Sequence, residues 1–341
     1  MARYNTYTAI VTHITLLRVI NTVQVVSAYL VSKLLRKPIM WGMPLGVSIE
    51  PTTSCNLRCP ECPSGLRNFT RPTGMLSMDN FTAVINQLYR RVTHLTFYFQ
   101  GEPYLNPQFL PMVRYAANKK MYTITSTNAH YLNDANAKAT VLSGLSKLII
   151  SLDGVSQEVY EQYRVGGNVT KVLEGAANVV KWRKQLGSAT PQIVFQYLVV
   201  QPNEHELQRA IQLTQELGVD DILFKTAQVY DYENGNALIP TQDQYSRYTK
   251  DNDGKWKIKN ALHNHCWKLW NSCVITWDGK VVPCCFDKDA KYTMGNAVTQ
   301  NFKQLWHSVP YTKFRTQVLL SRKNIDICAN CSEGSFVWTK S

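Results

Sequence analysis

Long apolar runs are missing from this sequence. A membrane-spanning helix needs roughly 18 or more consecutive apolar residues, and no such run exists here. The N-terminus also lacks the short apolar core and the small-residue cleavage site of a secretory signal peptide. Internal repeats and low-complexity tracts are absent as well. We therefore expect a cytoplasmic chain without a spanning helix.

Acidic residues are scarce relative to basic ones. The 341 residues include 24 Asp and Glu against 37 Lys and Arg, which gives a formal net charge of +13. Such an excess favours an anionic partner, namely membrane lipid, nucleic acid or an acidic leader peptide, although a basic solvated surface explains it equally well. Because the chain shows no RNA-binding module and no clustered basic stripe, we do not expect a nucleic acid partner.

The cysteines do not have the even spread of a secreted disulfide scaffold. There are nine, an odd number, in two groups far apart in the sequence. The first group is Cys55, Cys59 and Cys62, and the second is Cys266, Cys273, Cys284, Cys285, Cys328 and Cys331. This arrangement predicts metal ligation in a reducing cytoplasm.

Residues 8–36 form an amphipathic helical pattern. The apolar face consists of Leu16, Leu17, Val19, Ile20, Val23, Val26, Leu30, Val31, Leu34 and Leu35. The opposite face consists of Arg18, Asn21, Thr22, Ser32, Lys33 and Arg36. An apolar face opposite a basic polar face is typical of helices that lie in the membrane interface. This pattern predicts a peripheral position of the protein on the inner face of the membrane. Packing on the protein's own surface is the alternative, and either way we expect something to cover the apolar face.

From residue 45 onward, strand and helix patterns alternate. Apolar or β-branched runs lie at 45–49, 94–99, 121–125, 147–152, 193–200 and 221–224, and helical patterns lie near 78–90, 107–119, 132–142, 168–186 and 204–217. Such alternation predicts βαβ units around a parallel sheet. Six units fit a partial (β/α)6 TIM-like barrel better than a closed eightfold one. The expected fold class is therefore α/β.

We divide the chain into four regions. Residues 1–43 hold the amphipathic helix, 44–226 the barrel, 227–262 a linker, and 263–341 a small C-terminal domain. In the last region, 273–277 and 281–284 form a hairpin pattern, because Asp278-Gly279 suits a tight turn. Short helices are expected near 301–307 and 310–321.

The strongest chemical signal is Cys55-Asn-Leu-Arg-Cys59-Pro-Glu-Cys62, directly after the first predicted strand. Three thiolates at this spacing suit three corners of a cubane 4Fe–4S cluster. The fourth iron is then open to substrate, as an open metal position is in catalytic sites. A zinc site, or a redox pair of Cys59 and Cys62, is the alternative, although zinc would need a fourth ligand that is not close in sequence.

This loop and the alternating units resemble the radical S-adenosylmethionine (SAM) superfamily over about residues 44–226. The resemblance implies that the open iron binds the amino and carboxylate groups of SAM. An electron from the reduced cluster then cleaves SAM to methionine and a 5′-deoxyadenosyl radical, which abstracts hydrogen from a substrate. We accordingly expect an external one-electron reductant of the flavodoxin or ferredoxin kind.

Three further segments at predicted strand ends resemble the family's SAM-binding motifs. Gly101 and Glu102 resemble the Gly-Gly-Glu motif that meets the methionine amino group, with Gln100 in place of the first glycine. Ser126 and Asn128, and then Ser151 and Asp153, resemble segments near the ribose, and their hydroxyl, carboxamide and carboxylate groups suit ribose hydroxyls. Glu61 replaces the aromatic residue that usually precedes the third cysteine, so the adenine contact is expected from elsewhere.

The C-terminal cysteines resemble the SPASM and twitch extensions of this superfamily. The resemblance implies that Cys266, Cys284, Cys328 and Cys331 hold one auxiliary 4Fe–4S cluster with no open site, which suits electron transfer. Because the dense middle group of the full SPASM pattern is missing, the shorter twitch form fits better. Zinc is the alternative for this set. Cys285 is the alternative to Cys284, and Cys273 is expected in the core.

The leading hypothesis is therefore an enzyme that abstracts hydrogen from a peptide, a small molecule or a lipid. The resemblance does not name the substrate. The alternative from another class is a non-catalytic iron–sulfur protein that relays electrons or binds RNA.

Overall fold

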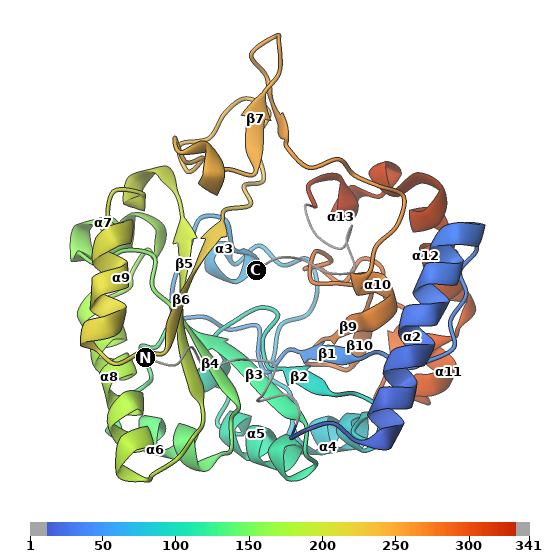
Figure 1. Ribbon diagram of the computed structural model, residues 1–341, viewed down its shortest axis with the longest axis horizontal. Coiled ribbons are helices and arrows are strands. Elements are labelled where there is room, and N and C mark those ends of the chain that lie inside the picture. The colour runs from blue at the N-terminus through green and yellow to red at the C-terminus, as the bar shows by residue number, and fades with distance from the viewer. Residues whose placement is uncertain (1–11, 332–341) are drawn as a thin grey trace.

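The computed structural model in Figure 1 describes residues 12–331. Its main sheet has nine strands in the order β11-β10-β9-β1-β2-β3-β4-β5-β6. Strands β1 to β6 are parallel neighbours, and they curve around a central lumen with helices on the outside. The predicted partial α/β barrel is confirmed.

The sheet strands are β1 (Gly46–Ile49), β2 (His94–Thr96), β3 (Tyr122–Thr127), β4 (Lys147–Ser151), β5 (Gln192–Val199), β6 (Asp221–Thr226), β9 (Ser272–Ile275), β10 (Lys280–Val282) and β11 (Gly295–Asn296). The longer helices are α2 (Leu16–Leu35), α4 (Met78–Leu88), α5 (Phe109–Asn118), α6 (Asp134–Leu142), α7 (Gln157–Tyr163), α8 (Val169–Gln185), α9 (Leu207–Glu216) and α12 (Val309–Ser321). The short ones are α3 (Pro63–Leu66), α10 (Lys268–Asn271), α11 (Phe302–Trp306) and α13 (Asp326–Ala329).

Local sequence explains where the outer helices begin. The side chains of Ser77, Asn133 and Asn168 accept backbone N–H groups at the N-termini of α4, α6 and α8, which satisfies donors that a helix leaves unpaired. The apolar faces of these helices pack on the sheet, where Phe81 and Phe97 are fully buried. Because β1 to β6 are parallel, their carboxyl ends meet at one rim of the barrel.

The C-terminal region extends the barrel sheet. Strand β9 pairs in parallel with β1, for example Val47 with Cys273, and β10 and β11 follow in antiparallel pairing. The predicted turn carries Gly279 at a φ of +85°, a conformation that glycine adopts without a steric penalty. The predicted linker also holds a hairpin that the sequence did not indicate, β7 (Tyr248–Lys250) and β8 (Trp256–Ile258), which projects at the top of Figure 1.

Helix α2 lies on the outside of the barrel beside α10 (Figure 1). Its buried residues are Arg18, Asn21, Val25, Ala28, Tyr29 and Ser32. Most of the predicted apolar face is exposed instead, and the helix packs on the barrel through polar side chains together with Val25, Ala28 and Tyr29. Arg18, from the predicted polar face, points toward the barrel, where backbone carbonyls bind its guanidinium. Residues 8–11 of the predicted helix lie outside the described residues.

No helix within residues 12–331 combines the length and the apolar character that crossing a membrane requires.

Candidate functional site

The three cysteines of the first group lie on the loop between β1 and α3. Cys59 is buried, Cys55 and Cys62 are half-buried, and Cys62 precedes the first turn of α3. All three border a cavity of about 160 Å³. The same cavity is bordered by Gly101, Glu102, Ser126, Asn128 and Ser151 from the ends of neighbouring strands. The fold thus brings eight of the nine residues predicted for this site to one place.

Gly101 holds the backbone close to the cysteine loop. Its φ is +74°, and a Cβ at this position would lie 2.3 Å from the carbonyl oxygen of Thr52. Only glycine fits such a close approach without moving the loop. Gln100, in place of the family's first glycine, brings its Oε1 to 3.5 Å from Ser64 Oγ, and Ser64 Oγ accepts the N–H of Gly101 at 2.9 Å.

Glu102 is buried next to this turn. Its carboxylate accepts the Thr127 hydroxyl at 2.7 Å and the backbone N–H groups of Asn128 and Tyr104 at 2.8 and 3.3 Å. Burial raises the pKa of Glu102 to about 7, although these hydrogen bonds oppose the shift. The carboxyl group therefore changes its charge near neutral pH, beside three thiols.

Asn128 and Asp153 differ in how they face the cavity. The Asn128 amide donates to Asn56 Oδ1 at 2.8 Å and so ties the β3 end to the cysteine loop. Asp153 does not border the cavity. One of its oxygens accepts the N–H of Leu198 at 2.7 Å, and the other accepts Arg164 Nε at 2.5 Å.

Arg164 is the site residue that the sequence analysis missed. It follows α7, borders the cavity, and directs Nη1 to 3.7 Å from the sulfur of Cys59. A single arginine at a helix end carries no motif, and only the fold brings it to a cysteine 105 positions away. It places one positive charge beside the thiol set.

This donor set fits a cluster with an anionic thiolate shell. Burial raises the pKa of Cys55 to about 11 and raises that of Cys59, while Arg164 opposes the shift at Cys59. Iron binding would supply the positive charge that keeps such buried thiols ionised. Within residues 12–331 no three His, Cys, Asp or Glu side chains lie close enough to bind one metal ion. In a cubane each thiolate binds a different iron, so its ligands stand farther apart.

Three of the four predicted auxiliary ligands, Cys266, Cys328 and Cys331, lie around Arg322, which is fully buried. Arg322 donates to the sulfur of Cys331 at 3.3 Å and to the carbonyl of His265 at 2.9 Å. The negative charges of the other thiols contribute to a raised pKa at Cys266, at Cys284 and at Cys328, although burial is the larger cause at each. The four thiols are therefore close enough to interact electrostatically, with a guanidinium among them.

Cys285 and Cys273 have different surroundings. Cys285 is exposed, and together with Cys284 it borders a cavity of about 510 Å³ inside the barrel. Tyr98 borders this cavity as well as the smaller one beside the first thiol set. Cys273 is buried within β9 and belongs to the main hydrophobic core.

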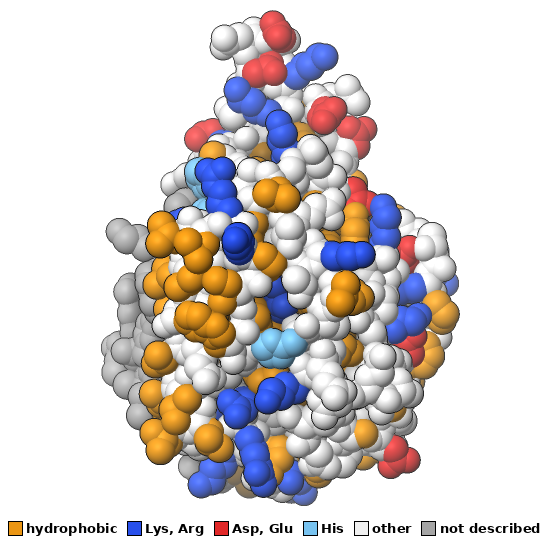
Figure 2. Space-filling model, turned by 90° about the vertical axis from the view of Figure 1, so that its right-hand side faces the viewer, with side chains coloured by type: hydrophobic (Ala, Val, Ile, Leu, Met, Phe, Trp, Pro, Cys, Tyr) orange, Lys and Arg blue, Asp and Glu red, His pale blue; other side chains and the backbone are white. Residues whose placement is uncertain are grey.

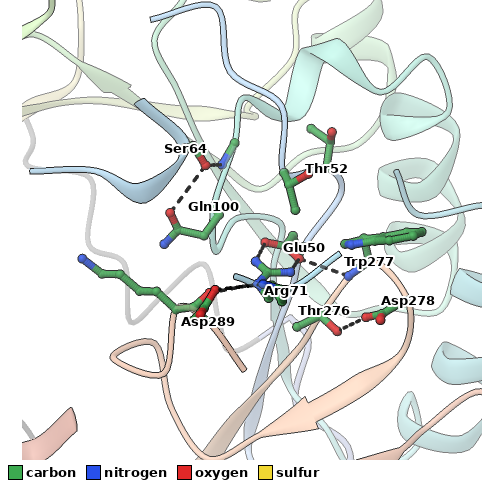
Figure 3. A network of polar contacts seen from close by, with 12 residues as sticks. Glu50, Thr52, Ser64, Arg71, Gln100, Thr276, Trp277, Asp278 and Asp289 are labelled. Atoms are coloured by element: carbon green, nitrogen blue, oxygen red, sulfur yellow. Dashed lines mark hydrogen bonds and ion pairs between the residues drawn. The ribbon is translucent and has the colours of Figure 1, made fainter. Parts of the chain in front are cut away.

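A buried ion pair joins the two thiol regions (Figure 3). Both guanidinium nitrogens at the tip of Arg71 bind the Glu50 carboxylate, at 2.9 and 2.6 Å, and Arg71 Nε donates to the carbonyl of Lys288 at 2.9 Å. Glu50 also accepts the N–H of Trp277 at 3.2 Å, and Asp289 accepts the N–H groups of Thr70 and Arg71. The end of β1, the segment after α3 and the C-terminal region thus share one polar network.

Several known proteins are similar to the chain over most of its length. The chain is 26% identical over 322 residues to the tungsten-containing aldehyde ferredoxin oxidoreductase cofactor-modifying protein of Pyrococcus furiosus, covering 83% of this chain and 86% of that protein. It is 25% identical to the PqqA peptide cyclase of Rhodopseudomonas palustris, covering 72% and 68%. The structure of Streptococcus suis SuiB bound to precursor peptide SuiA superposes with a TM-score of 0.62 at 14% identity, covering 88% and 72%, which shows the fold alone.

Two family models match consecutive parts of the chain. The SPASM model, an iron–sulfur cluster-binding domain, matches residues 266–332, which contain the auxiliary thiol set. The radical SAM superfamily model matches residues 49–222, more than half of the sequence, which contain the three-cysteine loop. The chain therefore belongs to the radical SAM superfamily of enzymes, which use a 4Fe–4S cluster with SAM, and it carries a SPASM region for auxiliary iron–sulfur chemistry.

Proposed function

We propose that the protein cleaves SAM reductively at the Cys55, Cys59 and Cys62 site and abstracts a hydrogen atom from a substrate held in the barrel lumen. The observation that carries this proposal is the single cavity shared by the three thiols and Glu102. When bound, the cluster and SAM supply a one-electron cleavage to methionine and a 5′-deoxyadenosyl radical. An external flavodoxin- or ferredoxin-like protein supplies that electron.

The protein's own residues bind and orient SAM. The Glu102 carboxylate accepts a hydrogen bond from the methionine amino group, because an ionised carboxylate is a strong, charge-assisted acceptor. Ser126, Asn128 and Ser151 present polar groups to the ribose. Asp153 acts by orienting Arg164, since both of its oxygens are already bonded.

We assign the auxiliary ligands to Cys266, Cys284, Cys328 and Cys331, in a twitch-like arrangement with one cluster. Cys285 interacts with Cys331, whereas Cys284 interacts with both Cys266 and Cys328 and is less exposed, which supports Cys284 as the ligand. These four thiolates would hold a closed cluster, which would supply an acceptor for the electron left on a substrate radical. The cavity of about 510 Å³ borders Cys284 and reaches Tyr98 next to the SAM site, which suits a substrate lying between the two thiol sets.

A peptide is the substrate class that we favour. One relative is named a peptide cyclase, and a structural neighbour is bound to a precursor peptide. The net charge of +13 fits an acidic peptide. Another relative is named a cofactor-modifying protein, which keeps a small molecule as the second candidate. A lipid is the third, supported by the exposed apolar side chains of α2. We place the protein in the cytoplasm, peripherally on the inner face of the membrane.

The proposed reaction is tested by its first product. The anaerobically reconstituted protein, given dithionite and SAM, is expected to form 5′-deoxyadenosine and methionine in equal amounts, measured by liquid chromatography. A candidate peptide that is the substrate should increase this rate and lose hydrogen. An iron-loaded protein that yields no 5′-deoxyadenosine would contradict the proposal.

SAM affinity should depend on pH through Glu102. Its pKa of about 7 means that the carboxylate is lost as the pH falls. Because the ionised carboxylate is the strong acceptor for the methionine amino group, SAM affinity is expected to drop about tenfold from about pH 8 to about pH 6. Calorimetric titration of the reconstituted protein measures this.

Glu102→Gln is the matched variant, because it keeps the shape and loses the titration. It should bind SAM weakly, with full iron content and without the pH slope. Wild-type affinity in Glu102→Gln, or the same slope in both proteins, would count against the assigned role.

A further inference from the structure

Helix α2 presents an exposed apolar face. Leu34, Leu16 and Val23 are 80%, 76% and 60% exposed. The other large exposed side chains of the helix are Leu17, Val19, Ile20, Leu30 and Leu35, all more than 40% exposed. In Figure 2 hydrophobic side chains gather along one side of the molecule, where α2 lies. A contiguous apolar surface of this kind marks an interaction site.

The orientation of this face is fixed by polar contacts on the other side of the helix. Arg18 donates to the carbonyls of Lys120 and Tyr89, at 2.5 and 2.6 Å, next to the C-termini of α5 and α4. Asn21 forms a two-way pair with the backbone of Met43, at 2.9 and 2.8 Å. Turning the apolar side chains inward would break these buried hydrogen bonds and leave polar groups unsatisfied.

The far end of α2 is fixed in the same way. Ser32 Oγ accepts the N–H of Ile39 at 2.9 Å, and Tyr29 packs on Trp267 and Trp270 with its hydroxyl 2.9 Å from His265 Nδ1. The helix is therefore anchored along its length, with its apolar side chains pointing outward.

Charge identifies the kind of partner. The first acidic residue of the sequence is Glu50, so nothing before it repels an anionic surface. Lys33, Arg36 and Lys37 are exposed at the C-terminal end of α2. At its N-terminal end lie the exposed Arg90 and Lys120, beside the carbonyls that Arg18 binds. Figure 2 shows Lys and Arg side chains above and below the apolar surface.

We propose that α2 docks the enzyme on an anionic membrane, lying in the interface with its apolar side chains among the lipids. An apolar face between two groups of cations is complementary to lipid chains beneath anionic headgroups. A second copy fits less well, because joining two such faces brings cations against cations. This inference rests on the contacts of α2 and is independent of the proposed radical chemistry.

Vesicle binding tests the proposal. The full-length reconstituted protein is expected to sediment with vesicles of equal parts phosphatidylcholine and phosphatidylglycerol, and not with phosphatidylcholine alone. Leu16→Gln with Leu34→Gln should lower the partition coefficient at least about tenfold, since two highly exposed apolar side chains are lost. Gln preserves the helix because its helix propensity is close to that of Leu.

Leu142→Gln with Leu186→Gln is the matched control, because these leucines are 51% and 40% exposed on the opposite side of the barrel. It should bind vesicles like the wild type. Lys33→Glu with Lys37→Glu, which leaves the apolar face intact, should also weaken binding at low salt. Iron content and thermal midpoint verify that each variant is folded.

Three results would overturn the membrane assignment. The first is a wild-type protein that does not bind anionic vesicles, and the second is an α2 leucine variant that binds them as the wild type does. The third is a dimer in sedimentation velocity without lipid that the α2 leucine variant abolishes, since a second copy would then cover the face.

Discussion

Replacing Cys55, Cys59 and Cys62 together with Ala is expected to leave about four irons per chain, where the wild type holds about eight after anaerobic reconstitution. The reason is that the two thiol sets are separate, and the auxiliary set keeps its four ligands and Arg322. SAM cleavage should fall below detection, because no other described cysteine borders the cavity that contains Glu102. Iron and sulfide analysis with a product assay measures both effects.

Single replacements in the C-terminal region provide the controls. Cys273→Ala removes a buried core thiol and should keep all of the iron. Cys284→Ala should lose the auxiliary cluster, whereas Cys285→Ala should retain it. A triple variant that kept its full iron content, or a wild type that bound zinc in place of iron, would show that the two-cluster interpretation is wrong.

The second large effect is expected at the Glu50–Arg71 pair. Arg71→Met leaves the Glu50 carboxylate buried without its guanidinium, which should destabilise the protein by about 3–5 kcal/mol. Because Arg71 also bonds the backbone at Lys288, both thiol regions should loosen, with faster iron loss. Denaturant midpoints and the rate of iron release to a chelator measure this.

Two variants distinguish a buried charge from a lost contact. Glu50→Gln with Arg71→Met removes both charges and should recover part of the stability, since no unpaired ion remains. Arg209→Met breaks the exposed pair with Glu216 and should leave the midpoint unchanged. If Arg71→Met left the denaturant midpoint unchanged, as is expected of Arg209→Met, the Glu50–Arg71 pair would not hold the two thiol regions together.

The sequence predicted the barrel and the thiol loop because both follow local periodicity and spacing. Parallel strands place their carboxyl ends together, so Glu102, Ser126 and Ser151 were expected near Cys55. Arg164 escaped prediction because its relation to Cys59 exists only in three dimensions.

Which face of α2 packs on the barrel could not be predicted from the sequence, for a related reason. A helical wheel identifies two faces but does not show which one meets the protein. Backbone carbonyls next to the C-termini of α4 and α5 bind Arg18 and so turn its face of the helix toward the barrel. These carbonyls come near Arg18 only in the assembled fold. The pairing of β9 with β1 is likewise set by tertiary structure, since the two strands are more than 200 residues apart.

That pairing has a consequence for any shortened version of the enzyme. Cutting the chain before β9 would leave β1 as an open sheet edge, with unsatisfied N–H and C=O groups from Gly46 to Ile49. Such an edge recruits strands from other molecules, and it would lie directly before the SAM-binding loop. The SPASM region therefore also covers the β1 edge of the barrel sheet. We therefore expect a barrel truncated before β9 to aggregate through its exposed β1 edge.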